Sequence, residues 1–218
     1  MDVQKYKILY KEGEAEISEK KSRFIANVFK VESEEQAVDI INNMKKKFWD
    51  ARHNCYAYII GNNNEVQKFS DDGEPSGTAG KPIMDIILSE KIHNCLIVVT
   101  RYFGGTLLGT GGLIRAYTKS TQEGIKESMV IEKCLGVMLS LTCDYTTSGK
   151  IQYLTATEHI PVLDTVYTDN VTFEMIVPVE EVGSVEKKFM EASMGKAVLE
   201  KGEETYYAEI DGKISYDL

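Results

Sequence analysis

The alternation of apolar and polar residues predicts an α+β protein. Phe24, Ala26 and Val28 alternate with polar neighbours, which is typical of a half-buried strand. Residues 54–60 and 66–69 alternate in the same way on either side of a polar turn, so they predict a hairpin. Residues 95–99 are apolar without a break, which predicts a strand buried on both faces.

Helices are predicted where apolar residues recur every three or four positions. The first begins at a capping box, residues 33–36, and carries apolar residues as far as Phe48. Two more helices are predicted, one beginning at Pro82 and one over residues 112–127. Together with the strands, they make up an N-terminal domain over residues 1–134.

The pattern changes near residues 130–133, and we place the domain boundary after residue 134. The C-terminal domain, residues 135–218, then follows the order strand, helix, strand, strand, helix, strand. Its predicted elements are residues 137–144, 148–158, 161–167, 171–177, 181–194 and 204–210. The βαββαβ order is that of a ferredoxin-like domain.

Two glycine-dense segments, residues 71–82 and 101–113, interrupt the N-terminal pattern. Glycine permits positive φ and close backbone approach, so both segments are predicted to be shaped loops. The second loop leads into a helix start, where unpaired N–H groups favour an anion, and Arg101 and Arg115 are placed to assist. Tight packing of the strand against the helix explains these glycines equally well.

The sequence does not match the common nucleotide-binding motifs. Residues 109–114 lack the third glycine of G-x-G-x-x-G, and no Gly-Lys-Ser/Thr follows a glycine run. Neither a Rossmann nor a P-loop site is therefore predicted.

The first loop crowds three carboxylates, Asp71, Asp72 and Glu74. They would either hold Mg²⁺ or cap the backbone of their own turn, and we favour capping because the spacing of a calcium loop is absent. The N–H groups of residues 77–81 are expected to point outward at the start of the next helix. His53 either faces these carboxylates as a general base or makes a structural hydrogen bond. We favour the hydrogen bond, since no nucleophile stands at a recognisable elbow.

Composition and charge narrow the class of protein. With 218 residues, 43% of them hydrophobic, the chain is long enough for two domains with real cores. It has no membrane-length apolar run and no signal-peptide pattern at its start, so a soluble cytoplasmic protein is expected. The four cysteines form no C-x-x-C pair and are expected to be reduced packing residues. Residues 1–134 carry 19 basic and 19 acidic side chains, whereas residues 135–218 carry 6 and 15, so any nucleic-acid contact is expected in the first domain.

Both glycine-rich loops, together with residues 21–25 and 50–58, resemble the signature blocks of the IMPACT (YigZ-type) family. The resemblance implies an N-terminal domain similar to domain 2 of ribosomal protein S5. It also implies a C-terminal domain like the ferredoxin-like domain of elongation factor G. Eukaryotic members of that family are translational regulators.

From the loops and the resemblance together we predict a non-enzymatic, translation-associated regulator that binds a protein or ribonucleoprotein partner. RNA binding through the N-terminal domain is left open, and no membrane contact, cofactor, metal ion or catalytic residue is predicted. The alternative is an enzyme acting on a phosphorylated or carboxylated small molecule bound at the same loops. The candidate binding residues for either function are His53, Asp71, Asp72, Gly73, Glu74, Gly77, Thr78, Gly80, Lys81, Arg101, Gly104, Gly105, Gly109, Thr110, Gly111, Gly112 and Arg115.

Overall fold

The computed structural model describes residues 4–216 and divides into two compact units. One unit spans Tyr6–Glu132, and the other contains the described residues from Lys133 onward together with Gln4 and Lys5. The sequence pattern predicts this boundary two residues later and assigns Gln4 and Lys5 to the first domain. Each unit combines strands with packed helices, so the α+β class is confirmed.

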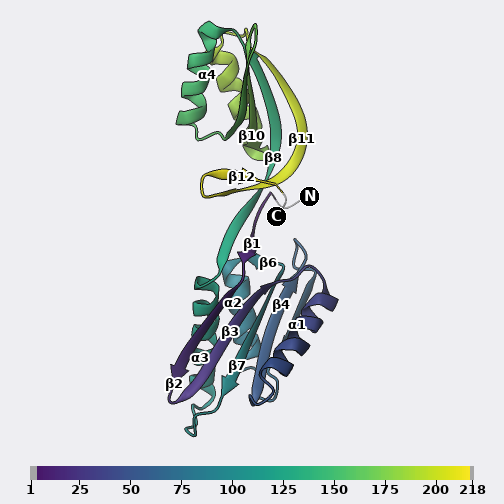
Figure 1. Ribbon diagram of the computed structural model, residues 1–218, viewed down its shortest axis with the longest axis vertical. Coiled ribbons are helices and arrows are strands. Elements are labelled where there is room, and N and C mark those ends of the chain that lie inside the picture. The colour runs from purple at the N-terminus through teal and green to yellow at the C-terminus, as the bar shows by residue number, and fades with distance from the viewer. Residues whose placement is uncertain (1–3, 217–218) are drawn as a thin grey trace. The chain divides into compact units, whose positions relative to one another are not determined.

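The first unit is built on a five-stranded antiparallel sheet in the order β2-β3-β7-β4-β5 (Figure 1). Its strands are β2 (Gly13–Glu19), β3 (Ser22–Lys30), β4 (His53–Ile60), β5 (Val66–Ser70) and β7 (Cys95–Tyr102). A short parallel pair joins β1 (Lys5–Lys11) to β6 (Ile92–His93). The central strand β7 is buried along all but its last residue, as its unbroken apolar run predicts.

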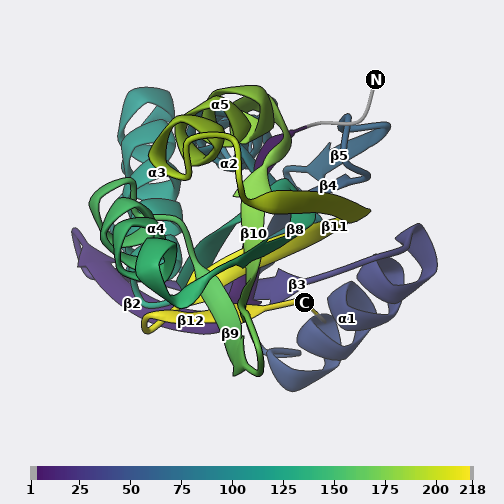
Figure 2. The ribbon, with the colours of Figure 1, turned by 90° about the horizontal axis from the view of Figure 1, so that it is seen from above.

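Helices pack on both faces of this sheet, as Figure 2 shows for α1 and α3. Helices α2 (Gly80–Glu90) and α3 (Thr110–Lys126) cover one face, and α1 (Glu34–Lys47) contacts β4 and β7 on the other. Alternate residues of β7 divide between the two resulting cores. Ile97 and Val99 join the core under α2 and α3, whereas Leu96 and Val98 join the core under α1.

The predicted cap of α1 is confirmed. The Ser33 hydroxyl accepts a hydrogen bond from the Gln36 N–H at 3.2 Å. The Gln36 side chain accepts in return from the Glu32 N–H rather than from Ser33 itself. This exchange satisfies donors that the first turn of a helix otherwise leaves unpaired.

The second unit has the predicted order of strands and helices. It consists of β8 (Met129–Cys143), α4 (Tyr145–Thr157), β9 (Val162–Tyr167), β10 (Val171–Pro178), α5 (Val182–Ala192) and β11 (Val198–Ile210), followed by the short β12 (Lys213–Ser215). The strands pair antiparallel in the order β9-β10-β8-β11-β12. Helices α4 and α5 supply the core with Ile151, Val185 and Phe189.

Two predicted boundaries in this unit are wrong. Strand β8 begins at Met129 rather than at residue 137, so residues 130–133, where the boundary between the units falls, are part of a strand. The β-branched residues Val130 and Ile131 favour extended structure. Val130 packs against the core under α2 and α3, and Ile131 is buried. Strand β11 begins at Val198 rather than at residue 204, and its pairing with β8 shifts register near Gly202, where glycine weakens a strand pattern.

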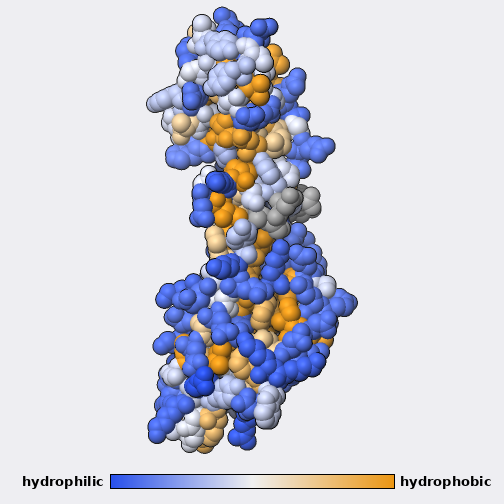
Figure 3. Space-filling model, in the orientation of Figure 1, coloured by the Kyte–Doolittle hydropathy of each residue, from blue (hydrophilic) through white to orange (hydrophobic). Residues whose placement is uncertain are grey.

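The surface of the described chain is mixed in character. The face drawn in Figure 3 shows hydrophobic side chains in small groups between hydrophilic ones. Within residues 4–216, no helix is both long enough and apolar enough to cross a membrane.

The start of α4 yields a prediction about pH. The Asp144 carboxylate accepts hydrogen bonds from the Thr146 hydroxyl and the Thr147 N–H, and these hold the pKa of Asp144 at about 2, below its ordinary 3.8. Because the folded pKa is depressed, the cap stabilises the fold above the ordinary pKa, and its contribution is lost as the pH falls toward 2. We expect an NMR titration of the Asp144 side-chain carboxyl carbon to show a midpoint near pH 2. A midpoint near 3.8 would show that the cap does not persist in solution.

Candidate functional site

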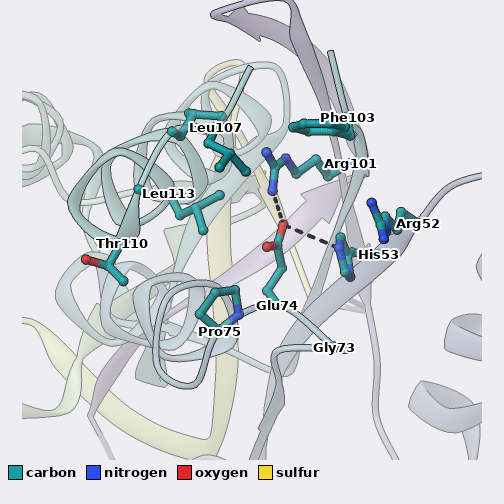
Figure 4. Close-up of a pocket in the computed structure, with 12 residues that line it drawn as sticks. Arg52, His53, Gly73, Glu74, Pro75, Arg101, Phe103, Leu107, Thr110 and Leu113 are labelled. Carbon is teal, nitrogen blue, oxygen red and sulfur yellow. Dashed lines mark hydrogen bonds and ion pairs between the residues drawn. The ribbon is translucent and has the colours of Figure 1, made fainter. Parts of the chain in front are cut away.

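The first unit carries a pocket of about 460 Å³ at the end of the sheet where β4 begins and β7 ends (Figure 4). Strands β4 and β7 pair with His53 opposite Arg101, which brings the two side chains to the same edge. The acidic loop after β5 and the glycine-rich loop before α3 complete the walls. The lining residues are Arg52, His53, Gly73, Glu74, Pro75, Arg101, Phe103, Leu107, Leu108, Gly109, Thr110 and Leu113. Both predicted loops therefore contribute to one pocket.

A buried ion pair lies at the floor of the pocket. Arg101 Nη1 donates to Glu74 Oε1 at 2.6 Å, and the two side chains are only 6% and 3% exposed. The guanidinium carbon lies over the rings of Phe24 and Phe103, at 5.4 and 5.6 Å from their centroids. The pair thus joins the two loops across the sheet end.

Tyr117 hydrogen-bonds to this ion pair, and Cys55 lies beside the Tyr117 hydroxyl. The Tyr117 hydroxyl donates to Glu74 Oε1 at 2.9 Å, and Cys55 Sγ lies 3.3 Å from that hydroxyl. Burial raises the pKa of Tyr117 and of Cys55 well above their ordinary values. Both groups therefore stay protonated at neutral pH, so Cys55 provides no thiolate nucleophile here.

His53 makes a structural hydrogen bond. Its Nδ1 donates to the backbone carbonyl of Asp72 at 2.9 Å, and its Nε2 lies 4.0 Å from Glu74 Oε1. This bond confirms the favoured prediction that His53 makes a structural hydrogen bond. The nitrogen that a general base would use faces the carboxylate that Arg101 already pairs.

The capping role of Asp71 is confirmed. Its carboxylate accepts from the N–H groups of Gly77, Ala79 and Gly80 at 2.8, 3.0 and 2.9 Å. The expectation that residues 77–81 point free N–H groups outward is therefore wrong for these three. The carboxylate occupies the positive end of the α2 dipole that an external anion would need.

Asp72 is also engaged within the fold. Its carboxylate accepts from the Asn54 N–H at 2.7 Å and pairs with Lys45 at 2.6 Å. Within the described part of the chain, no group of three or more His, Cys, Asp or Glu side chains is arranged to hold a metal ion. The carboxylates of Asp71 and Asp72 instead accept hydrogen bonds from backbone N–H groups and thereby fix the conformation of the loop.

The second glycine-rich loop has two distinct parts. Gly104 donates to the Ser22 hydroxyl, and a Cβ at this position would lie 2.1 Å from the Lys21 backbone, so only glycine fits. Gly109, with φ of 71°, is the N-cap of α3, and no side chain caps this helix. The start of α3 is therefore open at the pocket beside Thr110, whereas the start of α2 is closed by Asp71.

Some predicted site residues lie outside the pocket. Lys81 pairs with Asp85 along α2 at 2.9 Å, and the buried Thr78 hydroxyl donates to the Pro75 carbonyl. Arg115 lines a separate hollow with Lys20 and Lys119. Gly77 and Gly80 belong to the turn that Asp71 caps, while Gly105, Gly111 and Gly112 are not among the residues that line the pocket. Arg101, which the sequence places to assist an anion, donates to Glu74 in this structure.

The sequence interpretation also passed over several lining residues. They are Arg52, Pro75, Phe103, Leu107, Leu108 and Leu113. Leu107 is 82% exposed and Phe103 is 41% exposed. The sequence does contain an indication of this exposed apolar surface. Three large apolar residues, Phe103, Leu107 and Leu108, lie within one glycine-rich turn, and such a turn cannot place all of them in a core.

Comparison with known proteins places this geometry in a family. The family model described as Impact N-terminal domain matches residues 20–125, which include the whole pocket, and a domain of unknown function (DUF1949) matches residues 141–196. The chain is 42% identical to IMPACT family member YvyE of Bacillus subtilis (strain 168), over 89% of each chain. It is 32% identical to IMPACT family member YigZ of Escherichia coli (strain K12), over 83% of this chain and 89% of the relative.

A solved structure is also similar to this chain over both units. It is titled "Crystal structure of an hypothetical protein", aligns with a TM-score of 0.58 at 29% identity, and covers 90% of this chain and 97% of that one. The matches extend over both units and over most of the relatives' own length. On this evidence the chain belongs to the IMPACT family, as a member of the bacterial, YigZ type.

Proposed function

We propose that the chain is a non-enzymatic regulator associated with translation, which binds a protein or ribonucleoprotein partner through the pocket of the first unit. The observation that carries the proposal is the contrast between the rim and the floor of the pocket. Leu107 and Phe103 are exposed at the rim, whereas Arg101 and Glu74 at the floor neutralise each other. Exposed apolar side chains around a concave site favour a protein partner.

The link to translation comes from the family resemblance. The eukaryotic family members are expected to act as translational regulators, and the matched domain contains the pocket. An RNA contact is proposed only for the first unit, because the excess negative charge lies in residues 135–218.

The finer fold assignments are part of the same proposal. The second unit is proposed to be ferredoxin-like, like a domain of elongation factor G, and its βαββαβ order with sheet order β9-β10-β8-β11 supports this. The first unit is proposed to resemble domain 2 of ribosomal protein S5.

The alternative function is an enzyme acting on a phosphorylated or carboxylated small molecule. One observation favours it. The start of α3 lines the pocket at Gly109 and Thr110 without a side-chain cap, and such a helix terminus attracts anions.

Exchange of Leu107 for arginine tests the proposal. We expect Leu107→Arg to reduce capture of partners from lysate at least about tenfold, because a large apolar contact residue commonly accounts for that much binding. The free energy of unfolding in urea should not change, since Leu107 is 82% exposed. Leu88→Arg on α2, where Leu88 is 39% exposed, is the matched control and should capture normally. RNase treatment of parallel samples separates protein partners from ribonucleoprotein partners.

Two results would contradict the regulator. One is capture that is indifferent to Leu107→Arg. The other is stabilisation by a nucleotide or sugar phosphate, which at a hundred times its dissociation constant amounts to about 2.7 kcal/mol. The second result would support the enzyme.

A further inference from the structure

One oxygen of Glu74 has no partner within the described chain. Oε1 accepts from both Arg101 and Tyr117, while no donor of residues 4–216 bonds to Oε2. In Figure 4 the dashed lines end on one carboxylate oxygen, and the other points away from Arg101 and His53 toward the side where Pro75 and Leu113 lie. The side chain is 3% exposed and lines the pocket. Oε2 is not among the buried polar atoms without a partner, so it is open to the pocket, and an occupant that excludes water from the pocket must supply it with a donor.

The walls around this oxygen are apolar. Pro75 and Leu113 lie on one side of it, and Phe103, Leu107 and Leu108 complete the apolar lining. The volume of about 460 Å³ lies within the range of pockets that enclose small ligands or anchor side chains. The occupant must therefore combine a large apolar body with at least one hydrogen-bond donor.

The charges in the pocket favour a neutral donor. Arg101 already balances Glu74 at 2.6 Å, so a lysine or arginine side chain would add a second cation beside Arg101. A carboxylate would meet the Glu74 oxygen at close range and be repelled. The remaining charged group is Arg52, which is exposed at the rim, and the imidazole of His53 faces Oε1.

We propose that the pocket receives an aromatic side chain of the protein partner, tryptophan or tyrosine, and that its N–H or O–H donates to Glu74 Oε2. The inference rests on the proposed function and names the chemistry of its partner. Tryptophan and tyrosine combine an apolar ring with a single neutral donor, and they dominate the energetic centres of protein interfaces. Phenylalanine fits the same walls, but it excludes water from Oε2 without supplying a donor.

The protein offers a direct spectroscopic test. Trp49 is the only tryptophan, is 82% exposed and does not line the pocket, so Trp49→Phe yields a chain without indole fluorescence. The probe is N-acetyl-tryptophanamide, excited at the red edge of its absorption band, where tyrosine does not absorb. We expect its emission to move to shorter wavelength as the full-length variant is added, because the indole leaves water.

The donor is tested by pairs of probes. N-acetyl-tyrosinamide should displace the indole probe at a concentration at least about tenfold lower than N-acetyl-phenylalaninamide, which differs only by the hydroxyl. Methylation of the indole nitrogen should weaken the probe by a similar factor. Leu107→Ala in the same background should weaken binding, and Leu88→Ala should leave it unchanged.

Several results would overturn the inference. They are equal competition by the tyrosine and phenylalanine amides, no emission shift at the solubility limit of the probe, or a shift that Leu107→Ala does not alter. If partner capture still depends on Leu107 in those cases, the proposed function stands and only the aromatic anchor fails. If wild-type chains self-associate in sedimentation and Trp49→Phe abolishes this, a second copy of the chain is the occupant, which also overturns a separate partner.

Discussion

Replacement of Arg101 by alanine is expected to lower the free energy of unfolding by about 3–5 kcal/mol. The substitution would leave the Glu74 carboxylate, whose side chain is 3% exposed, without its counter-charge in a site that little water reaches. It would also remove the contacts of the guanidinium with the rings of Phe24 and Phe103. Urea denaturation followed by circular dichroism measures the loss directly.

An exposed arginine pair provides the control. Arg23 makes two hydrogen bonds of 2.8 Å to Glu16, but both side chains lie about half in solvent. Solvent screens such an exposed pair strongly, so Arg23→Ala should cost far less than Arg101→Ala. Equal losses for the two variants would mean that Arg101 and Glu74 do not form the buried pair in solution.

A double substitution separates the two parts of the effect. Exchange of both Arg101 and Glu74 for apolar residues of similar size removes the unpaired charge, and stability should recover much of the loss. The pocket would then lack the Glu74 Oε2 acceptor, so preference for the tyrosine amide over the phenylalanine amide should disappear. Compared with Arg101→Ala, the double substitution would thus raise the free energy of unfolding, while it would remove the preference for the tyrosine amide.

Local patterns in the sequence were enough to predict most elements of the fold. The unbroken apolar run at 95–99 led to the central strand β7, and the capping box at Ser33 led to the start of α1. The Asp71 cap could also be anticipated, because an aspartate before a glycine-rich turn commonly bonds the N–H groups that follow. In each case the interaction joins residues close in the chain.

Interactions between distant residues were not predictable in the same way. Glu74 and Arg101 are 27 positions apart, and their meeting depends on the register that sets His53 opposite Arg101. No local pattern specifies that register. The sequence therefore presented Arg101 and Arg115 as equivalent, although one is buried in an ion pair and the other lines a separate hollow.

The second large effect is expected at Asp71. Asp71→Ala removes the acceptor for three N–H groups, those of Gly77, Ala79 and Gly80. Loss of a helix cap costs about 0.5–2 kcal/mol, and hydrogen bonds to a charged group contribute about 1.5–3 kcal/mol each, with overlap between the two. We expect the free energy of unfolding to fall by about 3 kcal/mol in urea denaturation.

Two further variants show whether the loss arises from the cap. Asp71→Asn keeps one acceptor oxygen, so its loss should lie between wild type and Asp71→Ala. Asp85→Ala breaks an exposed pair with Lys81 on the same helix and should cost less than about 1 kcal/mol. A loss at Asp71 no larger than that at Asp85 would contradict the capping geometry.

The Asp71 variant also connects the fold to the pocket. The Glu74 N–H donates to the Asp71 carbonyl at 2.9 Å, so the turn that Asp71 holds closed is the one that positions Glu74. A loosened turn lets Glu74 leave the orientation in which Oε2 faces the pocket. Asp71→Ala should therefore weaken binding of the indole probe even under conditions where the chain remains folded, whereas Asp85→Ala should not. Unchanged probe affinity in folded Asp71→Ala protein would show that Arg101 and Tyr117 alone are enough to hold Glu74 in place.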